Sequence, residues 1–145
     1  EYRQKFMSKA KNRSIPHSRT RDHHANETAE DYVEAVHDVI ENKGECRVSD
    51  LAAHFDVSHV TVSRIVARLA SAELLDTEPY RPISLTDAGE KLARKMNKRN
   101  EIVYQFLLYL GVEEMTAKID SEGIEHHVSE KTLLAMKRNL KSPSQ

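Results

Sequence analysis

The stretch "RVSDLAAHFDVSHVTVSRIVARLASAELL" (residues 47–75) decides the fold. Ser49 is placed to cap a short helix, and Ser58 is placed to cap a second one. Asp56 stands at the break between them and tolerates the left-handed backbone that a tight turn requires. The pattern therefore predicts a helix-turn-helix. The apolar residues of its second helix share one face: Val62, Ile65, Val66 and Leu69.

The opposite face of the second helix carries polar side chains rich in hydrogen-bond donors. Side chains of this kind suit the major groove of DNA, although helical hairpins also occur in proteins that never bind DNA. The chemistry favours DNA binding through this face, whose polar residues are His59, Thr61, Ser63, Arg64 and Arg68.

A short hairpin is predicted next, from "LLDTEPYRPISLT" (residues 74–86). Pro79 and Pro82 lack the N–H that a strand ladder needs, so the two strands must be short and lie at an edge. Such a hairpin is the wing of a winged helix-turn-helix. Arg81 at its tip is either a phosphate contact or a plain exposed loop arginine.

The chain before the motif divides near Glu27. Residues 1–26 hold seven Lys or Arg against two acids and show no amphipathic period, which predicts a mobile basic arm. This arm either adds nonspecific phosphate contacts or is a solvated tail, partly left from cloning. After it, apolar residues recur at helical spacing up to Gly44, and Asn26 or Thr28 is placed to cap this first helix.

The C-terminal half is expected to be helical. A long helix opens at Thr86 or Asp87 and ends at Gly111, and two more follow at about 113–128 and 129–140, the last capped by Ser129. Their apolar faces have few partners within the chain, which favours a helical dimer interface. The expected class is mainly α, with a winged helix-turn-helix at 27–90 and an all-helical metal-binding and dimerisation domain at 91–145.

The composition indicates the cellular compartment in which the protein works. No apolar run approaches the roughly 18 residues that cross a bilayer. The single Cys46 has no cysteine partner for a disulfide or a thiolate metal site. These features predict a soluble, cytoplasmic protein without membrane contact.

The segment "SEGIEHHVSE" (residues 121–130) places two carboxylates, those of Glu122 and Glu125, next to two imidazoles. On a helix, Glu122, Glu125 and His126 stand at i, i+3 and i+4 and converge on one face, while His127 points elsewhere. Carboxylate oxygens beside an imidazole suit a divalent cation, although a charged, solvated helix face gives the same spacing. A second carboxylate pair at i and i+3 lies on the first helix: Asp31 and Glu34.

The whole arrangement resembles the diphtheria toxin repressor family, and within it the manganese transport regulators that lack a C-terminal third domain. The resemblance runs from about Thr20 to Leu140 and is carried by "DYVEAV", "RVSDLAAHFDVSHVTVSRIVARL", "PYRPISLTDAGEKLA" and "GVEEMTAKIDSEGIEHHVSE". It implies a homodimeric repressor, and not an enzyme, that a divalent metal activates. The implied partner is a palindromic double-stranded DNA operator near metal-transport genes.

The resemblance also implies a metal site. The family's manganese positions fall here on Asp31, Glu34, Glu122, Glu125 and His126. The iron-responsive relatives hold softer Met and Cys where Asp31 and Glu122 stand, so hard oxygen donors at both places suit Mn2+. Another divalent metal (Fe, Zn or Co) or a non-metal ligand is the alternative effector.

Asn100 departs from the family's pattern, which usually has a metal-ligating His at this position. Its amide oxygen is a candidate metal ligand, and a plain surface role is the alternative. Three explanations of this change remain open: a natural adjustment of the site's metal preference, the loss of one ion of a two-ion site, or an engineered substitution. Glu101 and His127 are candidates to compensate, although neither occupies the matching angle.

The resemblance assigns roles on the recognition helix as well. Base-facing positions fall on His59, Val60 and Arg64, and phosphate contacts on Thr61, Ser63 and Arg68. The family often has Pro where Val60 stands, which suggests a different operator. The remaining expected DNA contacts are Arg47, Ser58 and Arg81.

Overall fold

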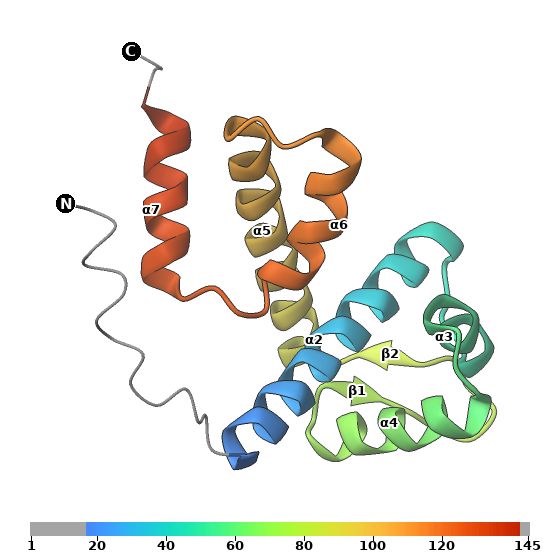
Figure 1. The fold of residues 1–145 in the computed structure, drawn as a ribbon. Coiled ribbons are helices and arrows are strands. Elements are labelled where there is room, and N and C mark those ends of the chain that lie inside the picture. Colours follow the sequence, from blue (N-terminus) through green and yellow to red (C-terminus); the bar gives the residue numbers. More distant parts are fainter. Residues whose placement is uncertain (1–16, 143–145) are drawn as a thin grey trace.

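The structure is a computed structural model that describes residues 17–142 of the chain. Its elements follow one another as in Figure 1, where helices dominate and one small sheet lies beside α4. The expected class, mainly α with a winged helix-turn-helix, is confirmed. The elements are α2 (His17–Lys43), α3 (Val48–Phe55), α4 (His59–Ser71), β1 (Leu75–Asp76), β2 (Ser84–Leu85), α5 (Asp87–Tyr109), α6 (Glu114–Ile124) and α7 (Glu130–Lys141).

The helix-turn-helix forms from α3 and α4 as the capping pattern predicts. Asp56 takes the left-handed conformation, with φ 53°, and the hydroxyl of Ser58 caps α4 by accepting from the Thr61 N–H at 3.1 Å. The predicted cap at Ser49 is wrong, because α3 already begins at Val48. The N-terminus of α3 is stabilised by the Asp50 carboxylate, which accepts a hydrogen bond from the Arg47 N–H at 2.8 Å.

The wing is an antiparallel hairpin in which Leu75 lies opposite Leu85. A further bridge joins Ile83 to Cys46, whose carbonyl accepts from the Ile83 N–H at 2.7 Å. This isolated bridge ties Cys46, which is fully buried, to the residue that precedes β2. The short hairpin agrees with the limits that the two prolines set.

The first helix is longer than expected. It begins at His17, so residues 17–26 are helical and the predicted caps at Asn26 and Thr28 are wrong. Inside the helix, the Thr28 hydroxyl donates to the His24 carbonyl at 2.8 Å. A helix propagates at low cost from a packed segment through polar residues without Pro or Gly, so the missing amphipathic period did not end it. The rest of the expected arm, residues 1–16, lies outside the described residues.

The apolar stripe of α2 packs against the helix-turn-helix. Tyr32, Val33 and Val36 are buried there together with Leu51 and Val62. The Tyr32 ring stacks on Phe55 with centroids 4.3 Å apart. Because the stripe faces the DNA-binding unit, the polar flank of α2 is left facing the C-terminal helices.

The long helix α5 joins the two halves of the chain. Thr86 caps it by accepting from the Gly89 N–H at 3.0 Å, and Gly111, with φ 89°, follows its end. Gly89 lies so close to the wing that a Cβ there would stand 2.0 Å from the Leu74 carbonyl oxygen. The domain boundary expected between residues 90 and 91 therefore falls inside one continuous helix.

The helix predicted for residues 113–128 ends early. α6 stops at Ile124, and residues 125–128 form a turn before Ser129 caps α7 by accepting from the Thr132 N–H at 3.2 Å. The guanidinium of Arg99 on α5 stabilises the turn, since it donates to the Glu125 carbonyl at 2.8 and 3.0 Å and to the Val128 carbonyl. A distant side chain thus takes the place of the helical hydrogen bonds.

The C-terminal helices leave large apolar side chains exposed, as expected for a dimer interface. The exposed apolar residues are Tyr109, Leu110, Met115, Ile119 and Leu134. None of the described helices is both long and apolar enough to cross a membrane.

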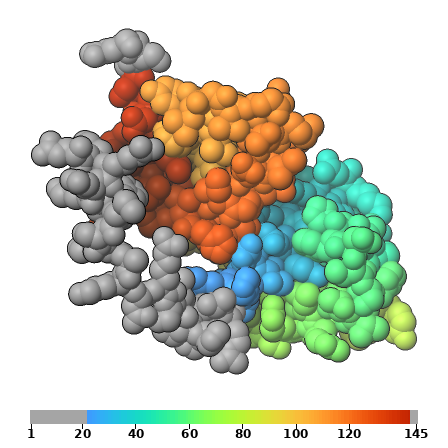
Figure 2. All heavy atoms as spheres, in the orientation of Figure 1, coloured from blue at the N-terminus to red at the C-terminus, as the bar shows by residue number. Residues whose placement is uncertain are grey.

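In Figure 2 the orange surface around α6 meets the blue surface of α2 along a seam, and the site described below lies between these elements.

Candidate metal centre

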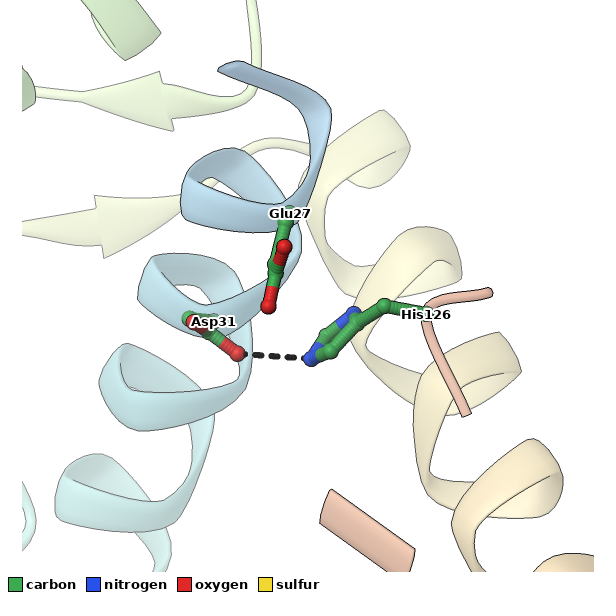
Figure 3. Close-up of side chains that lie close together, drawn as sticks. All are labelled: Glu27, Asp31 and His126. Atoms are coloured by element: carbon green, nitrogen blue, oxygen red, sulfur yellow. Dashed lines mark ion pairs between the residues drawn. The ribbon is translucent and has the colours of Figure 1, made fainter. Parts of the chain in front are cut away.

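One face of α2 presents four carboxylates to the turn after α6. They follow the helical repeat at i, i+3, i+4 and i+7, which places them on successive turns of the same side. Figure 3 shows two of them, Glu27 and Asp31, pointing toward the imidazole of His126. The four are Glu27, Glu30, Asp31 and Glu34.

His126 is the centre of the cluster. Its side chain is 2% exposed, and both ring nitrogens contact carboxylates of α2: Nδ1 lies 2.6 Å from Glu30 Oε2 and Nε2 lies 2.8 Å from Asp31 Oδ1. Glu125 Oε1 approaches the same Nε2 at 3.6 Å. The turn after α6 is therefore attached to the helix that packs on the DNA-binding unit.

A cavity of about 410 Å³ opens beside this imidazole. Ligand atoms of Glu34, Glu125 and His126 lie within 4.8 Å of one another, and we call these three residues the inner cluster. Glu34 and Glu125 line the cavity. Asn100 also lines the cavity, and its amide donates to the Ser121 hydroxyl at 3.3 Å. The other predicted metal ligands that line it are Asp31 and Glu122.

The electrostatics of the inner cluster favour a bound positive charge. Burial, together with the nearby Glu125 charge, raises the pKa of Glu34 to about 8. Burial likewise raises the pKa of Glu125 to about 7, against a lowering contribution from Asn100. Burial alone would lower the pKa of His126, but its hydrogen bonds to Asp31 and Glu30 raise it to about 10. Protons thus neutralise a site that is crowded with carboxylates.

The residues present fit a divalent cation. Glu125 is 2% exposed, and its Oε2 has no hydrogen-bond partner among the described residues. A buried carboxylate oxygen without a partner is costly unless a cation or a proton occupies its lone pairs. Carboxylate and amide oxygens with one imidazole are the donors that Mn2+ and similar ions accept.

Comparison with known proteins agrees with this geometry. Residues 24–83 match the model "Iron dependent repressor, N-terminal DNA binding domain", and residues 86–145 match "Iron dependent repressor, metal binding and dimerisation domain". Transcriptional regulator MntR of Escherichia coli O6:H1 is 46% identical over 117 residues, 81% of this chain and 76% of that protein. The chain belongs to the iron-dependent repressor family.

Further members of the iron-dependent repressor family are similar over most of the chain. HTH-type transcriptional regulator MntR of Bacillus subtilis strain 168 is 42% identical over 100 residues, 69% of this chain and 70% of that protein. A solved manganese-dependent transcriptional repressor in complex with manganese is 27% identical with a TM-score of 0.71. That match covers 79% of this chain, which spans about half (53%) of the solved chain's length.

Membership in this family of transcriptional regulators confirms two predictions from the sequence. The resemblance to the diphtheria toxin repressor family is confirmed, and so is the expectation that the chain is not an enzyme. The two domain matches meet at residues 83 and 86, where β2 passes into α5. The whole of α5 therefore lies within the match to the metal-binding domain, and its first turn packs against the wing at Gly89.

The residues predicted to contact DNA lie on the surface of the first domain. On α4 they are exposed, including Val60 at 68%. A groove of about 460 Å³ between α4 and the wing is lined by Arg47, His59, Ser63 and Arg81. Arg81 contacts Glu78 at 3.1 Å, and Arg47 contacts Glu45 at 3.2 Å. The others on α4 are Thr61, Arg64 and Arg68, and Ser58 caps the helix.

Three residues around the metal centre are not predicted from the sequence: Glu27, Glu30 and Arg99. Glu27 and Glu30 continue the i, i+3, i+4 spacing of Asp31 and Glu34, so this spacing was the signal for them. Arg99 had no local signal, because its acceptors are carbonyl groups 26 and 29 residues further along the chain. Only the fold brings Arg99 to the turn.

Proposed function

We propose that this chain is a Mn(II)-activated transcriptional repressor that binds a palindromic operator as a homodimer in the cytoplasm. The observation that carries the proposal is the buried Glu125 carboxylate, whose Oε2 has no hydrogen-bond partner among the described residues and which belongs to a cluster built from both domains. The relatives named for manganese support the choice of metal. The residues proposed to hold the ion are Asp31, Glu34, Asn100, Glu122, Glu125 and His126.

The proposed ligands belong to two separate parts of the molecule. Asp31 and Glu34 lie on α2, whose apolar face is part of the core of the DNA-binding domain. Glu125 and His126 lie after α6, in the metal-binding and dimerisation domain. A bound divalent cation supplies the positive charge that offsets repulsion among these carboxylates. Asp31, Glu34 and Glu125 then hold α2 against the turn without needing protons.

Fixing α2 sets the position of the recognition helix. Val62 and Val66 of α4 belong to the same buried core as Val33 and Val36 of α2, so we expect the two helices to move as one body. In a homodimer, this defines the separation of the two α4 helices, which a palindromic operator requires to be about one DNA turn, roughly 34 Å. Binding of Mn(II) and of DNA is therefore coupled, and each strengthens the other by the same factor.

The decisive test is operator affinity at fixed salt with and without Mn(II). A DNA fragment selected from a random library by the Mn(II)-loaded protein provides the probe, and fluorescence anisotropy provides the affinity. We expect Mn(II) to tighten binding about 5- to 150-fold, the range of a coupling of about 1 to 3 kcal/mol. An operator affinity that is the same in metal-stripped and Mn(II)-loaded protein contradicts the proposal.

Affinity for Mn(II) is expected to fall as the pH is lowered from 8 to 6. Metal ligands must lose their protons, and in the metal-free site Glu34 and Glu125 have pKa values raised to about 8 and about 7. Both groups gain protons in this interval, so the apparent affinity should drop at least about tenfold. Calorimetric titration in buffers of different ionisation enthalpy measures the affinity and the released protons. A flat pH profile without proton release would refute this prediction.

Two arginines of α4 are expected to affect DNA binding in different ways. Arg64, proposed to face a base, can donate to guanine O6 and N7, so Arg64→Ala should reduce discrimination at one base position by about 1 to 3 kcal/mol. Arg68→Ala should weaken binding to all sequences alike, because a phosphate contact carries no base information. Anisotropy over a set of single-base operator variants separates the two. The opposite assignment of effects would show that the roles are exchanged.

A further inference from the structure

A groove lies between α5 and α7, away from the metal centre. Figure 1 shows the two helices alongside each other, and the groove between them has a volume of about 730 Å³. It lies on a different face of α5 from the metal cavity, because Lys98, which lines the groove, and Asn100, which lines the cavity, are about 200° apart around the helix. The α5–α7 groove is therefore a separate feature of the surface.

The floor of the α5–α7 groove is apolar. It is formed by Ile102 of α5 together with Leu133 and Leu134 of α7. Leu133 is buried, but Leu134 is 57% exposed. A single exposed leucine is common on protein surfaces. Here, however, Leu134 continues an apolar floor inside a concave surface, where a partner that covers it gains hydrophobic stabilisation.

The rim of the α5–α7 groove is basic. Six basic side chains line the groove against three acidic ones. Arg94 is already paired with Glu90 at 3.0 Å. Arg99 is paired with Glu130 at 2.9 Å. Among the described lysines only Lys43, which lies elsewhere, forms an ion pair. The lysines of the groove are therefore left without a carboxylate partner in the described part of the chain, and they are Lys91, Lys95, Lys98 and Lys137.

The lysines of α5 follow the helical repeat. Lys91, Lys95 and Lys98 stand at i, i+4 and i+7, so their charges form one stripe along the groove. Like charges at this spacing destabilise a helix, and an anionic partner removes that penalty. The stripe and Ile102 together extend over roughly 16 Å of α5, or about three helical turns.

We propose that the α5–α7 groove binds an acidic amphipathic helix of a partner protein. Apolar side chains of such a helix cover the floor, and its carboxylates, repeated on every turn, face the lysine stripe. Duplex DNA offers phosphates but no apolar face that could cover Leu134. The segment of this chain before Glu27 is itself basic, so it does not complement the groove. This interaction goes beyond the proposed function and does not rest on the metal centre.

Binding of a synthetic acidic helix to the Mn(II)-loaded full chain tests the groove. The probe is a fluorescein-labelled peptide of about 15 residues, with leucines at helical spacing on one face and glutamates on both flanks. A peptide of the same composition in scrambled order is the comparison. We expect the amphipathic peptide to bind at least about tenfold tighter in fluorescence anisotropy, because only its leucines can cover the floor together. Its affinity should fall with rising salt, since exposed ion pairs are screened.

Single substitutions locate the binding surface. Lys95→Glu should weaken binding of the amphipathic peptide at least about fivefold, and so should Leu134→Gln. Lys131→Glu is the matched control, because it makes the same charge change at an exposed position of α7 outside the groove. It should change the affinity less than about twofold. Each variant should keep the rise in Tm that Mn(II) produces, which verifies that it is folded.

Four results would each overturn the acidic-helix site. The first is no binding of the amphipathic peptide, and the second is equally tight binding of the scrambled one, which would mean that only net charge is recognised. The third is a loss of affinity for duplex DNA in Lys95→Glu without a loss of peptide binding, which would assign the lysines to nucleic acid. The fourth is a change of dimer mass in Leu134→Gln by sedimentation equilibrium, which would assign this face to a contact between copies of the chain. The proposed function is tested separately, by operator affinity with and without Mn(II).

Discussion

Replacing Glu125 by Gln is expected to abolish the response of the protein to Mn(II). The substitution keeps the shape of the side chain but removes the charge at the one carboxylate of the inner cluster that is buried and has a free oxygen among the described residues. At a hundredfold excess over its Kd, a ligand stabilises a folded protein by about 2.7 kcal/mol. Thermal unfolding with and without Mn(II) should therefore show a rise in Tm of several degrees in the wild type and no rise in the variant.

The metal-free variant is expected to be at least as stable as the wild type. A carboxyl group whose folded pKa lies above its unfolded value costs stability as pH rises past the unfolded value, and burial raises the pKa of Glu125 from 4.5 to about 7. The advantage of Gln should therefore grow between pH 5 and pH 7. Glu101→Gln, at an exposed position of α5, is the control and should keep the Mn(II) effect. A Glu125→Gln protein that Mn(II) still stabilises would place the ion elsewhere.

Gly89→Ala is expected to destabilise the fold by about 3 kcal/mol or more. The added methyl group would lie 2.0 Å from the Leu74 carbonyl oxygen, and the clash is with backbone that cannot rotate away. That carbonyl also accepts from the Thr86 N–H at 3.2 Å, so moving it breaks the junction of the wing and α5. Urea unfolding of the metal-free protein at pH 7 measures the change in the free energy of unfolding.

Gly123→Ala is the matched control for this change. Gly123 is also helical, but a Cβ there meets nothing within 4 Å among the described residues. Ala in a helix interior is more stable than Gly by roughly 0.5 to 1 kcal/mol, so this variant should be slightly stabilised. Equal effects of the two substitutions would mean that the Leu74 contact does not limit residue 89.

Local chemistry explains which elements the sequence predicted well. The caps at Ser58, Thr86 and Ser129 and the left-handed turn at Asp56 involve residues within a few positions of one another, and all four are present. The wing follows in the same way from two prolines three positions apart in a short hairpin. Short-range patterns of this kind act before any tertiary contact exists.

Long-range contacts explain what the sequence missed. The end of α6 at Ile124 depends on Arg99, which holds the turn from another helix. Spacing on an assumed helix predicts that Glu122, Glu125 and His126 converge, yet His126 lies in the turn after α6 and reaches Asp31 because that turn lies against α2. On that assumed helix His127 points away from the other ligands, but in the turn it contacts Glu27.

Because α5 is continuous, the number of residues along it sets the angle between the wing junction at Gly89 and the turn that Arg99 holds. One residue inserted between Gly89 and Arg99 would turn everything after it by about 100° and shift it by about 1.5 Å. The guanidinium of Arg99 would then face away from the turn, while the wing junction at Gly89 stayed in place. An exchange of sensing domains between relatives that is made within α5 should therefore keep the residue count along the helix, because a continuous helix transmits any change of phase to everything after it.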